Sequence, residues 1–394
     1  MLFRSLSNKS EDGIIINNKT SRVYYGGEAF GRLIGYVGNI TAEELENKSN
    51  DGYTSTSLIG KAGIEQVFED TLRGEDGAEI YLKRNSEEIS IVLALVSSPS
   101  YDSNMFTTYV TKTKAAERES NNYSDTVNRF NKTYAPGSTM KLITAAIGLN
   151  TTSLNPNEKV EINGLKWQKD SSWGNYFITR VENISAVSLR EAAKYSDNIY
   201  FAQTALKIGS EDLINGIKSF GIGEKMNLEY PMTNSSILNN EILLADTGYG
   251  QGELMVTPLN MALAYSALAN NGNIMTPRLT LSNNNTNVIW KENAIKPEHL
   301  QTLIDDFSAM VNDEDGHAHI AKIEGYNIAA KTGTAEIKSS QDDNNGTENG
   351  WFVAVDTTSS KLSIAVIIED VKNRGGSSIP IPMVKNIMEE YLTR

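Results

Sequence analysis

The run of residues 134–149 constrains the fold most, because it joins a helix-breaking start to an apolar body. Pro136 and Gly137 disfavour a helix interior, whereas residues 139–149 are apolar on nearly every face. The pattern predicts a buried helix that begins near Ser138.

A hydroxyl and an ammonium group stand at the start of this helix. Ser138 and Lys141 are three residues apart, so both side chains lie on one face of the helix, about one turn from each other. At that spacing the lysine can take the serine proton, which is the S-x-x-K arrangement of serine acyltransferases. By itself the spacing is a weak signal, because serine and lysine are common residues and a structural helix can carry both.

Length and charge limit the class of protein. A chain of 394 residues exceeds the size at which one hydrophobic core usually keeps growing, so we expect two or more domains. The 49 acidic and 36 basic residues give a net charge of -13, and no dense run of lysine and arginine is present. Nucleic acid is therefore not an expected partner.

Several kinds of chemistry are disfavoured by what the chain lacks. The absence of cysteine excludes disulfides, thiolate metal sites and cysteine nucleophiles, and it fits an exported bacterial protein. The histidines are His299, His317 and His319, and the acidic residues 313–315 beside the last two predict a solvated loop rather than a cation site. We expect no metal and no cofactor.

No stretch approaches the roughly 18 apolar residues of a membrane span, and residues 1–6 are too short for a signal peptide.

The N-terminal part of the chain contains little that looks catalytic. Residues 59–77 predict an amphipathic packing helix, and Thr41 followed by Glu44 predicts a capped helical turn. The apolar side of the packing helix is predicted to hold Ile64, Val67, Phe68 and Leu72. Residues 89–96 are a candidate buried strand that opens a second domain.

Helical patterns follow the opening helix, after a loop-rich segment at 151–185 whose Trp167 and Trp173 are expected to pack on the domain below. The predicted helices cover 189–195, 199–208 and 257–269. Thr257 and Pro258 are suited to the start of the last of these.

The C-terminal part changes to a strand pattern. Residues 328–337, 351–355 and 362–368 predict consecutive strands, with residues 338–349 as a hairpin loop, and short connections imply an antiparallel sheet. A final helix is expected after Pro380 and Pro382. The residues predicted to pack it on the sheet are Val384, Ile387, Met388 and Leu392.

Two further motifs make the serine and lysine specific. Ser196-Asp197-Asn198 and Lys331-Thr332-Gly333 follow S-x-x-K in chain order, and together they form the three-part set of penicillin-binding proteins and serine β-lactamases. Each motif also lies in a suitable context: a helix start, a break between helices, and a strand before a hairpin.

Residue types suggest the roles in catalysis. Ser138 is the predicted nucleophile, and its backbone N–H can point at the oxyanion. Lys141 is the predicted base, and burial together with the positive charge of Lys331 should lower its pKa. Ser196 would relay a proton to the leaving amine, and Asn198 would hold the substrate amide.

The Lys331 strand is the predicted binding surface for the substrate. The hydroxyls of Thr332 and Thr334 would bind a carboxylate, and Gly333 leaves room for a peptide along the strand edge. The Thr334 N–H would be the second oxyanion donor.

The chain resembles the class B penicillin-binding proteins, and within them the low-affinity, β-lactam-resistance type of Gram-positive cocci. Beyond the three motifs, the resemblance covers most of the chain. It is carried by residues 33–38, 60–63, 96–102, 167–173 and 244–252.

This resemblance implies an α+β multidomain fold. Residues 89–394 would form a penicillin-binding transpeptidase domain, in which helices flank an antiparallel sheet beside an all-helical subdomain. Residues 1–88 would form an incomplete, elongated α+β pedestal without catalytic function.

The resemblance also implies the reaction and the partners. Ser138 would attack the penultimate D-Ala of a peptidoglycan stem pentapeptide, D-Ala would leave, and an amine from a second strand would resolve the acyl-enzyme. β-Lactams, which imitate the D-Ala-D-Ala end, would stall at the acyl stage and bind with low affinity. Such proteins act at the outer face of the bacterial membrane, where a membrane glycan polymerase is the implied partner.

The sequence departs from the family pattern in three places. The family's N-terminal membrane anchor is not found, so we expect a truncated ectodomain. Residues 83–88 run almost directly into Ile91, where the family has a partner strand and a Thr-Gly turn, so a segment is expected to be missing. A second omission is expected before Arg22.

Three other functions share these motifs. A serine β-lactamase needs a base that activates water, and no acidic residue in a suitable loop is recognisable between Ser196 and Lys331. A β-lactam sensor would acylate in the same way but lacks a large N-terminal region. A catalytically silent scaffold is disfavoured, because every chemical position holds a competent residue.

Overall fold

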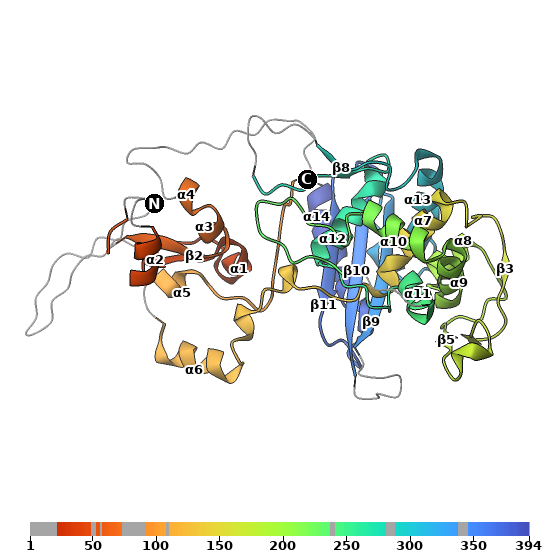
Figure 1. Ribbon diagram of the computed structural model, residues 1–394, viewed down its shortest axis with the longest axis horizontal. Coiled ribbons are helices and arrows are strands. Elements are labelled where there is room, and N and C mark those ends of the chain that lie inside the picture. The colour runs from red at the N-terminus through yellow and green to blue at the C-terminus, as the bar shows by residue number, and fades with distance from the viewer. Residues whose placement is uncertain are drawn as a thin grey trace, which may run out of the picture. The chain divides into compact units, whose positions relative to one another are not determined.

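A computed structural model describes residues 22–48, 53–55, 57–72, 91–107, 110–236, 241–280, 288–337 and 346–393. The chain forms two compact units (Figure 1). Unit 1 is Met1–Phe130 with Glu229–Pro231 and Arg278–Leu281, and unit 2 holds the other residues up to Arg394. The predicted domain boundary at 88 falls outside the described residues and stays a prediction. None of the described helices is long and apolar enough to cross a membrane.

Unit 1 combines short helices with an antiparallel strand pair, β1 (Tyr36–Asn39) and β2 (Leu58–Ala62). Its helices are α1 (Gly31–Ile34), α2 (Ala42–Asn47), α3 (Gly63–Val67), α4 (Glu69–Leu72), α5 (Asn104–Thr107) and α6 (Lys112–Ser120). The predicted turn at Thr41 is confirmed: the Thr41 hydroxyl accepts from Glu44 N–H, and the Glu44 carboxylate accepts from Thr41 N–H.

The predicted packing helix at 59–77 is wrong at its first four residues, and of its predicted apolar side Val67 is exposed, whereas Ile64, Phe68 and Leu72 are partly buried. Ile59 to Ala62 belong to strand β2, and the remainder divides into α3 and α4, with residues 73–77 outside the described part. The buried side chains of these helices are Glu65 and Glu69. The Glu69 carboxylate accepts from the Tyr53 hydroxyl and the Gly60 N–H, so this buried acid has its hydrogen-bond partners.

The predicted buried strand at 89–96 is also wrong over its described residues. Ile91 forms one isolated parallel bridge with Arg278, while Leu93 and Val96 are 55% and 58% exposed. A strand buried on both faces needs ladder partners and cover on both sides, and this segment has neither among the described residues.

The sheet of unit 2 confirms the predicted antiparallel strands. Its strands are β9 (Ile328–Ile337), β10 (Thr347–Asp356) and β11 (Ser363–Ile368), in the order β11-β10-β9 (Figure 1). The register sets Thr332 opposite Phe352 and Lys331 opposite Val353. Of the predicted hairpin loop at 338–349, residues 338–345 lie outside the described residues, and the loop prediction is wrong at 347–349, which belong to β10.

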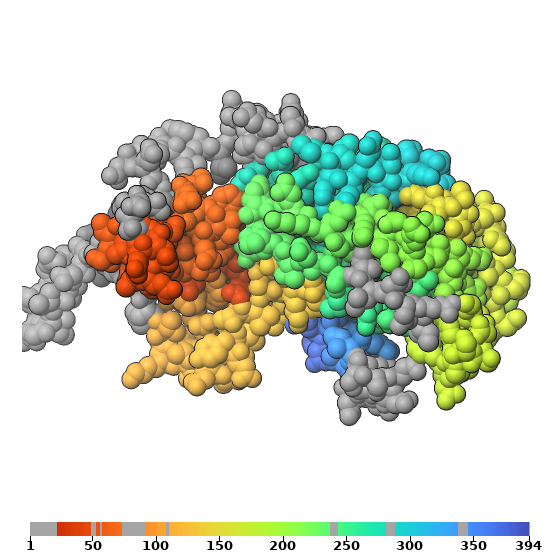
Figure 2. All heavy atoms as spheres, in the orientation of Figure 1, coloured from red at the N-terminus to blue at the C-terminus, as the bar shows by residue number. Residues whose placement is uncertain are grey.

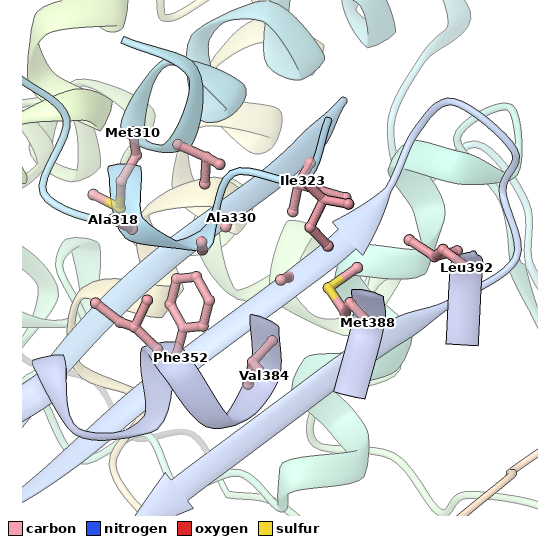
Figure 3. Packing of buried hydrophobic residues seen from close by; sticks show 13 residues of the cluster. Met310, Ala318, Ile323, Ala330, Phe352, Val384, Met388 and Leu392 are labelled. Carbon is pink, nitrogen blue, oxygen red and sulfur yellow. The ribbon is translucent and has the colours of Figure 1, made fainter. Parts of the chain in front are cut away.

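One face of this sheet packs on α14 (Pro380–Leu392). Figure 3 shows Phe352 facing Val384, with Met388 and Leu392 further along the helix. The prediction that Ile387 packs on the sheet is wrong, because its side chain is 49% exposed. Pro380 begins the helix, where its missing N–H costs no hydrogen bond.

The other helices of unit 2 include those predicted. They are α7 (Lys141–Asn150), α8 (Leu189–Lys194), α9 (Asn198–Ile208), α10 (Ser210–Ser219), α11 (Glu241–Gly248), α12 (Pro258–Ser266) and α13 (Pro297–Asn312). In α12 the Thr257 hydroxyl accepts from Asn260 N–H, and Pro258 occupies the first turn, as predicted. In Figure 2 green and cyan atoms of unit 2 lie in front of the blue C-terminal residues, which are visible only at the lower edge of the unit.

Short strand pairs complete unit 2. They are β3 (Val160–Glu161) with β6 (Ala186–Val187), β4 (Lys166–Trp167) with β5 (Ile178–Thr179), and β7 (Ile274–Met275) with β8 (Ile289–Lys291). Trp173 is buried and meets Trp167, which is partly buried, edge to face at 5.6 Å, so the two rings pack on each other.

Candidate active site

Ser138 lies in a tight turn rather than in the α-helix itself. Gly137–Met140 forms a 3₁₀ turn, and α7 begins at Lys141. The Thr139 hydroxyl donates to the Pro136 carbonyl at 2.6 Å, and the Gly137 N–H donates to the Gly250 carbonyl at 2.9 Å. These bonds fix the backbone on both sides of Ser138, and the buried body of α7 anchors the turn from behind.

Lys141 gathers the first two motifs around one nitrogen. Its Nζ lies 2.8 Å from Ser138 Oγ, 2.8 Å from Ser196 Oγ and 2.7 Å from Asn198 Oδ1. It also lies 2.7 Å from the Ser196 carbonyl oxygen. Ser196 Oγ is in turn 3.0 Å from Ser138 Oγ, so a proton can pass between the two hydroxyls and the amine.

Burial suits Lys141 to the role of a base. Its side chain is fully buried, and burial followed by the positive charge of Lys331 lowers the pKa of Lys141 well below its usual value, while Asp197 acts in the opposite direction. Burial also lowers the pKa of Lys331 to about 7. Both amines are therefore closer to losing their protons than exposed lysines are.

The second motif depends on a strained residue and a buried ion pair. Ser196 has a φ of 59°, a backbone conformation that is unfavourable for residues other than glycine. Next to it, Asp197 Oδ1 caps the Tyr200 N–H at the start of α9, and Asp197 Oδ2 accepts from Arg180 Nη1 at 2.7 Å. Fixed on both oxygens, this carboxylate holds Ser196 and Asn198 on either side of it.

Asn198 connects the base to the β4–β5 hairpin. While its Oδ1 accepts from Lys141, its Nδ2 donates to the Thr179 carbonyl at 2.9 Å. The side-chain amide is thus held by two contacts, and its orientation follows from them.

The third motif lies on β9, and its residues face both sides of the sheet. Gly333 lies against the nucleophile turn, because a Cβ at Gly333 would come within 3.1 Å of the Thr139 nitrogen. Lys331 is fully buried, and its Nζ lies 3.2 Å from the Thr332 carbonyl. Thr332 is 8% exposed, with its hydroxyl 3.8 Å from Met310 Sδ, whereas Thr334 is more accessible.

The structure thus brings Ser138, Lys141, Ser196 and Asn198 into direct contact. β9 adjoins their turn through Gly333 and Thr334, since a Cβ at Gly137 would lie 2.6 Å from the Thr334 carbonyl oxygen.

Residues that the motifs do not contain also support the site. Arg180, Thr179 and Gln251 were not predicted, because their contacts join segments far apart in sequence. Asp197 lies within the second motif but has no predicted catalytic role. An acidic residue without a catalytic role in a motif suggests a structural role. Among the described residues no group of three or more acidic or histidine side chains could hold a metal ion.

Gly137→Ala is expected to destabilise unit 2 more than Gly325→Ala, by about 1–3 kcal/mol of unfolding free energy. Both glycines have positive φ, of 54° and 82°, so both variants have the same backbone penalty. The difference arises because the alanine methyl at 137 would lie 2.6 Å from the Thr334 carbonyl oxygen, whereas nothing lies within 4 Å of the methyl at 325. Urea unfolding of both variants measures the difference, and equal midpoints would contradict the tight approach.

Two family models match the chain. The model described as "Penicillin binding protein transpeptidase domain" matches residues 87–389, and the model described as "Penicillin-binding Protein dimerisation domain" matches residues 3–104.

Curated relatives agree with these models. Penicillin-binding protein 3 of Bacillus subtilis is 40% identical over 424 residues, which cover 95% of this chain and 63% of that protein. The chain therefore spans less than two thirds of that relative's length. Peptidoglycan D,D-transpeptidase PbpA of Mycobacterium tuberculosis is 29% identical over 363 residues, covering 86% of this chain and 72% of that protein.

Solved structures share the fold. Pseudomonas aeruginosa PBP2, in complex with WCK 5153, has a TM-score of 0.76 at 24% identity and covers 97% of this chain and 94% of that chain. Helicobacter pylori PBP2 has a TM-score of 0.75 at 20% identity, with 95% and 79% covered. Since the transpeptidase model matches more than half of the chain and the solved structures share its two-domain fold, the chain belongs to the class B penicillin-binding protein transpeptidases.

Proposed function

We propose that this protein is a serine D,D-transpeptidase that cross-links peptidoglycan stem peptides through an acyl-enzyme on Ser138. The observation that carries the proposal is the 2.8 Å contact between the buried Lys141 Nζ and Ser138 Oγ. A lysine with a lowered pKa at hydrogen-bond distance from a serine is the arrangement that activates this nucleophile.

The proposed acylation step begins when neutral Lys141 takes the Ser138 proton and Oγ attacks the carbonyl carbon of the penultimate D-Ala. The backbone N–H groups of Ser138 and Thr334 would stabilise the oxyanion. Ser196, in contact with both Ser138 and Lys141, would carry the proton to the nitrogen of the departing D-Ala. The C–N bond then breaks, and the acyl group stays on Oγ.

The other site residues have proposed binding roles. Asn198 would orient the substrate amide, and Lys331 would provide positive charge near the substrate carboxylate. Thr332 and Thr334 would offer hydroxyls to that carboxylate, and Gly333 would leave space for the peptide. An amine of a second stem peptide then attacks the ester carbonyl, and Ser138 recovers its proton.

Transpeptidation is favoured over β-lactam hydrolysis by the surroundings of the nucleophile. Among the described residues, no carboxylate forms a hydrogen bond with Ser138, Lys141 or Ser196. Asp197 is held by Arg180, and Asp246 is held by tyrosine hydroxyls. A water that attacks the acyl-enzyme would need a carboxylate base beside Ser138. We therefore expect the acyl-enzyme to return slowly to free enzyme.

The experiment is incubation with a fluorescent penicillin, followed by intact mass over hours, with Ser138→Ala as the matched blank. A stable adduct that is absent from the blank supports the acyl-enzyme. Rapid return to free enzyme would favour a β-lactamase, and no adduct at high drug concentration would rule out both. A D-Ala-D-Ala donor with an added amine acceptor then separates a transpeptidase, which forms a cross-linked product, from a sensor, which does not.

We also propose three finer properties on the basis of the family resemblance. They are low β-lactam affinity of the coccal resistance type, a place at the extracytoplasmic face of the bacterial membrane, and a membrane glycan polymerase as partner, because cross-linking needs glycan strands. The second-order rate constant for acylation of Ser138 tests the first property.

A further inference from the structure

One edge of β9 has no strand partner among the described residues. Its other edge pairs with β10 along its length. In an antiparallel ladder the N–H and C=O of one residue point to the same side. The Thr334 carbonyl oxygen lies beside the nucleophile turn, so Thr334 directs both backbone groups away from β10 and toward that turn.

The Thr334 carbonyl oxygen already accepts a hydrogen bond from a side chain. Gln251 Nε2 donates to the Thr334 carbonyl oxygen at 3.1 Å. A peptide that adds to a strand edge donates its own N–H groups to such outward carbonyls. Gln251 therefore holds the acceptor that an acyl donor lying along β9 would use nearest to the reacting serine.

The backbone around Gln251 is fixed on both sides. The Gln251 N–H donates to the Asp246 carbonyl at 2.9 Å, and the preceding carbonyl, that of Gly250, accepts from Gly137 N–H at 2.9 Å. Gly250 itself has a φ of 85°, as this turn requires. The Gln251 amide is consequently held over the β9 edge by the same turn that supports Ser138.

A buried carboxylate anchors the start of this turn. Asp246 Oδ1 accepts from the Tyr249 hydroxyl at 2.5 Å and from the Tyr176 hydroxyl at 2.6 Å. Tyr176 lies between β4 and β5, so the hairpin that orients Asn198 through Thr179 is tied to the turn that holds Gln251. The backbone of Gln251 is therefore held in place, so its side chain can leave the Thr334 carbonyl only by rotating about its own bonds.

We propose that Gln251 guards the β9 edge and determines which acyl donors react quickly. The proposal rests on the acyl-transfer function proposed above. A donor with an amide N–H beside its reacting carbonyl competes with the Gln251 amide for Thr334 O, whereas a donor without that N–H does not compete for this acceptor. Gln251 thus slows the first class selectively.

The test compares acylation of wild type and Gln251→Leu by two β-lactams. Benzylpenicillin carries an acylamino N–H, and a carbapenem with a hydroxyethyl side chain does not. Gln251→Leu removes the hydrogen bond from Gln251 to the Thr334 carbonyl. Because one net hydrogen bond no longer has to be broken, the variant should be acylated about 3- to 10-fold faster by benzylpenicillin. The rate with the carbapenem should stay within about twofold of wild type. Gln301→Leu, on the exposed surface of α13, is the matched control and should change neither rate.

An equal change with both drugs, or slower acylation by benzylpenicillin, would overturn the role of Gln251 while leaving the acyl-enzyme intact. If wild type forms no Ser138 adduct with either drug, the proposed function fails, and this inference with it. Gln251→Met, which keeps the side-chain length, gives the same comparison if the leucine variant does not fold.

Discussion

Lys141→Met is expected to lower the rate constant for acylation of Ser138 by about 10²- to 10⁴-fold, the contribution of one positioned base. Methionine nearly matches the length of the lysine chain but offers no amine at 2.8 Å from Ser138 Oγ. Removing the base leaves a serine hydroxyl that is a poor nucleophile at neutral pH. A labelling time course with fluorescent penicillin, quantified by intact mass, measures the rate.

The pH dependence of wild type provides a second measurement of the same role. The pKa of Lys141 is lowered by burial, so the neutral, active form is lost only as the pH falls through that depressed value. Lys331, with its pKa lowered to about 7, loses its charge as the pH rises through about 7. Acylation by anionic donors should therefore fall on both sides of an optimum, and the acid limb should disappear in Lys141→Met.

Lys207→Met is the matched control, because the Lys207 side chain is 47% exposed and lies on α9, away from the contacts of Lys141. Its acylation rate should stay within about twofold of wild type. Circular dichroism and thermal unfolding establish that both variants fold. Acylation by Lys141→Met within about tenfold of wild type would show that Lys141 is not the base.

Much of the candidate site could be predicted from the sequence because each motif carries its local signal with it. Pro136 and Gly137 mark the turn before Ser138, and short apolar runs joined by a polar segment indicate the hairpin of β9 and β10. The exact form of the turn could not be read in this way. A 3₁₀ turn often precedes an α-helix, and here the tertiary contacts of Gly137 with Gly250 and Thr334 accompany the 3₁₀ form.

The failures of prediction occurred where tertiary contacts outweighed local pattern. Ile59 and Gly60 fit either a helix start or a strand, and pairing with β1 together with the Glu69 carboxylate selects the strand. The segment beginning at Ile91 has the composition of a buried strand but finds a single bridge. Arg180 gave no local signal at all, since its partner Asp197 is 17 residues further along the chain.

Arg180→Met is expected to lower the free energy of unfolding of unit 2 by about 3–5 kcal/mol, because it leaves a buried carboxylate without its partner. The Arg180 side chain is 0% exposed and that of Asp197 is 6% exposed. Arg180 also donates to the carbonyls of Ile162, Gly164 and Ile184, all of which would be left without this donor. Urea unfolding followed by circular dichroism measures the loss.

Acylation should fall together with stability in Arg180→Met, because Asp197 separates Ser196 from Asn198 and its displacement moves both contacts of Lys141. Arg190→Met is the matched control: its ion pair with Asp313 is 2.9 Å long, but the arginine side chain is 44% exposed, so we expect a loss of no more than about 1 kcal/mol. Arg180→Lys keeps the charge and should recover part of both losses. If the two methionine variants unfold at the same urea concentration, the Arg180–Asp197 pair does not support the site.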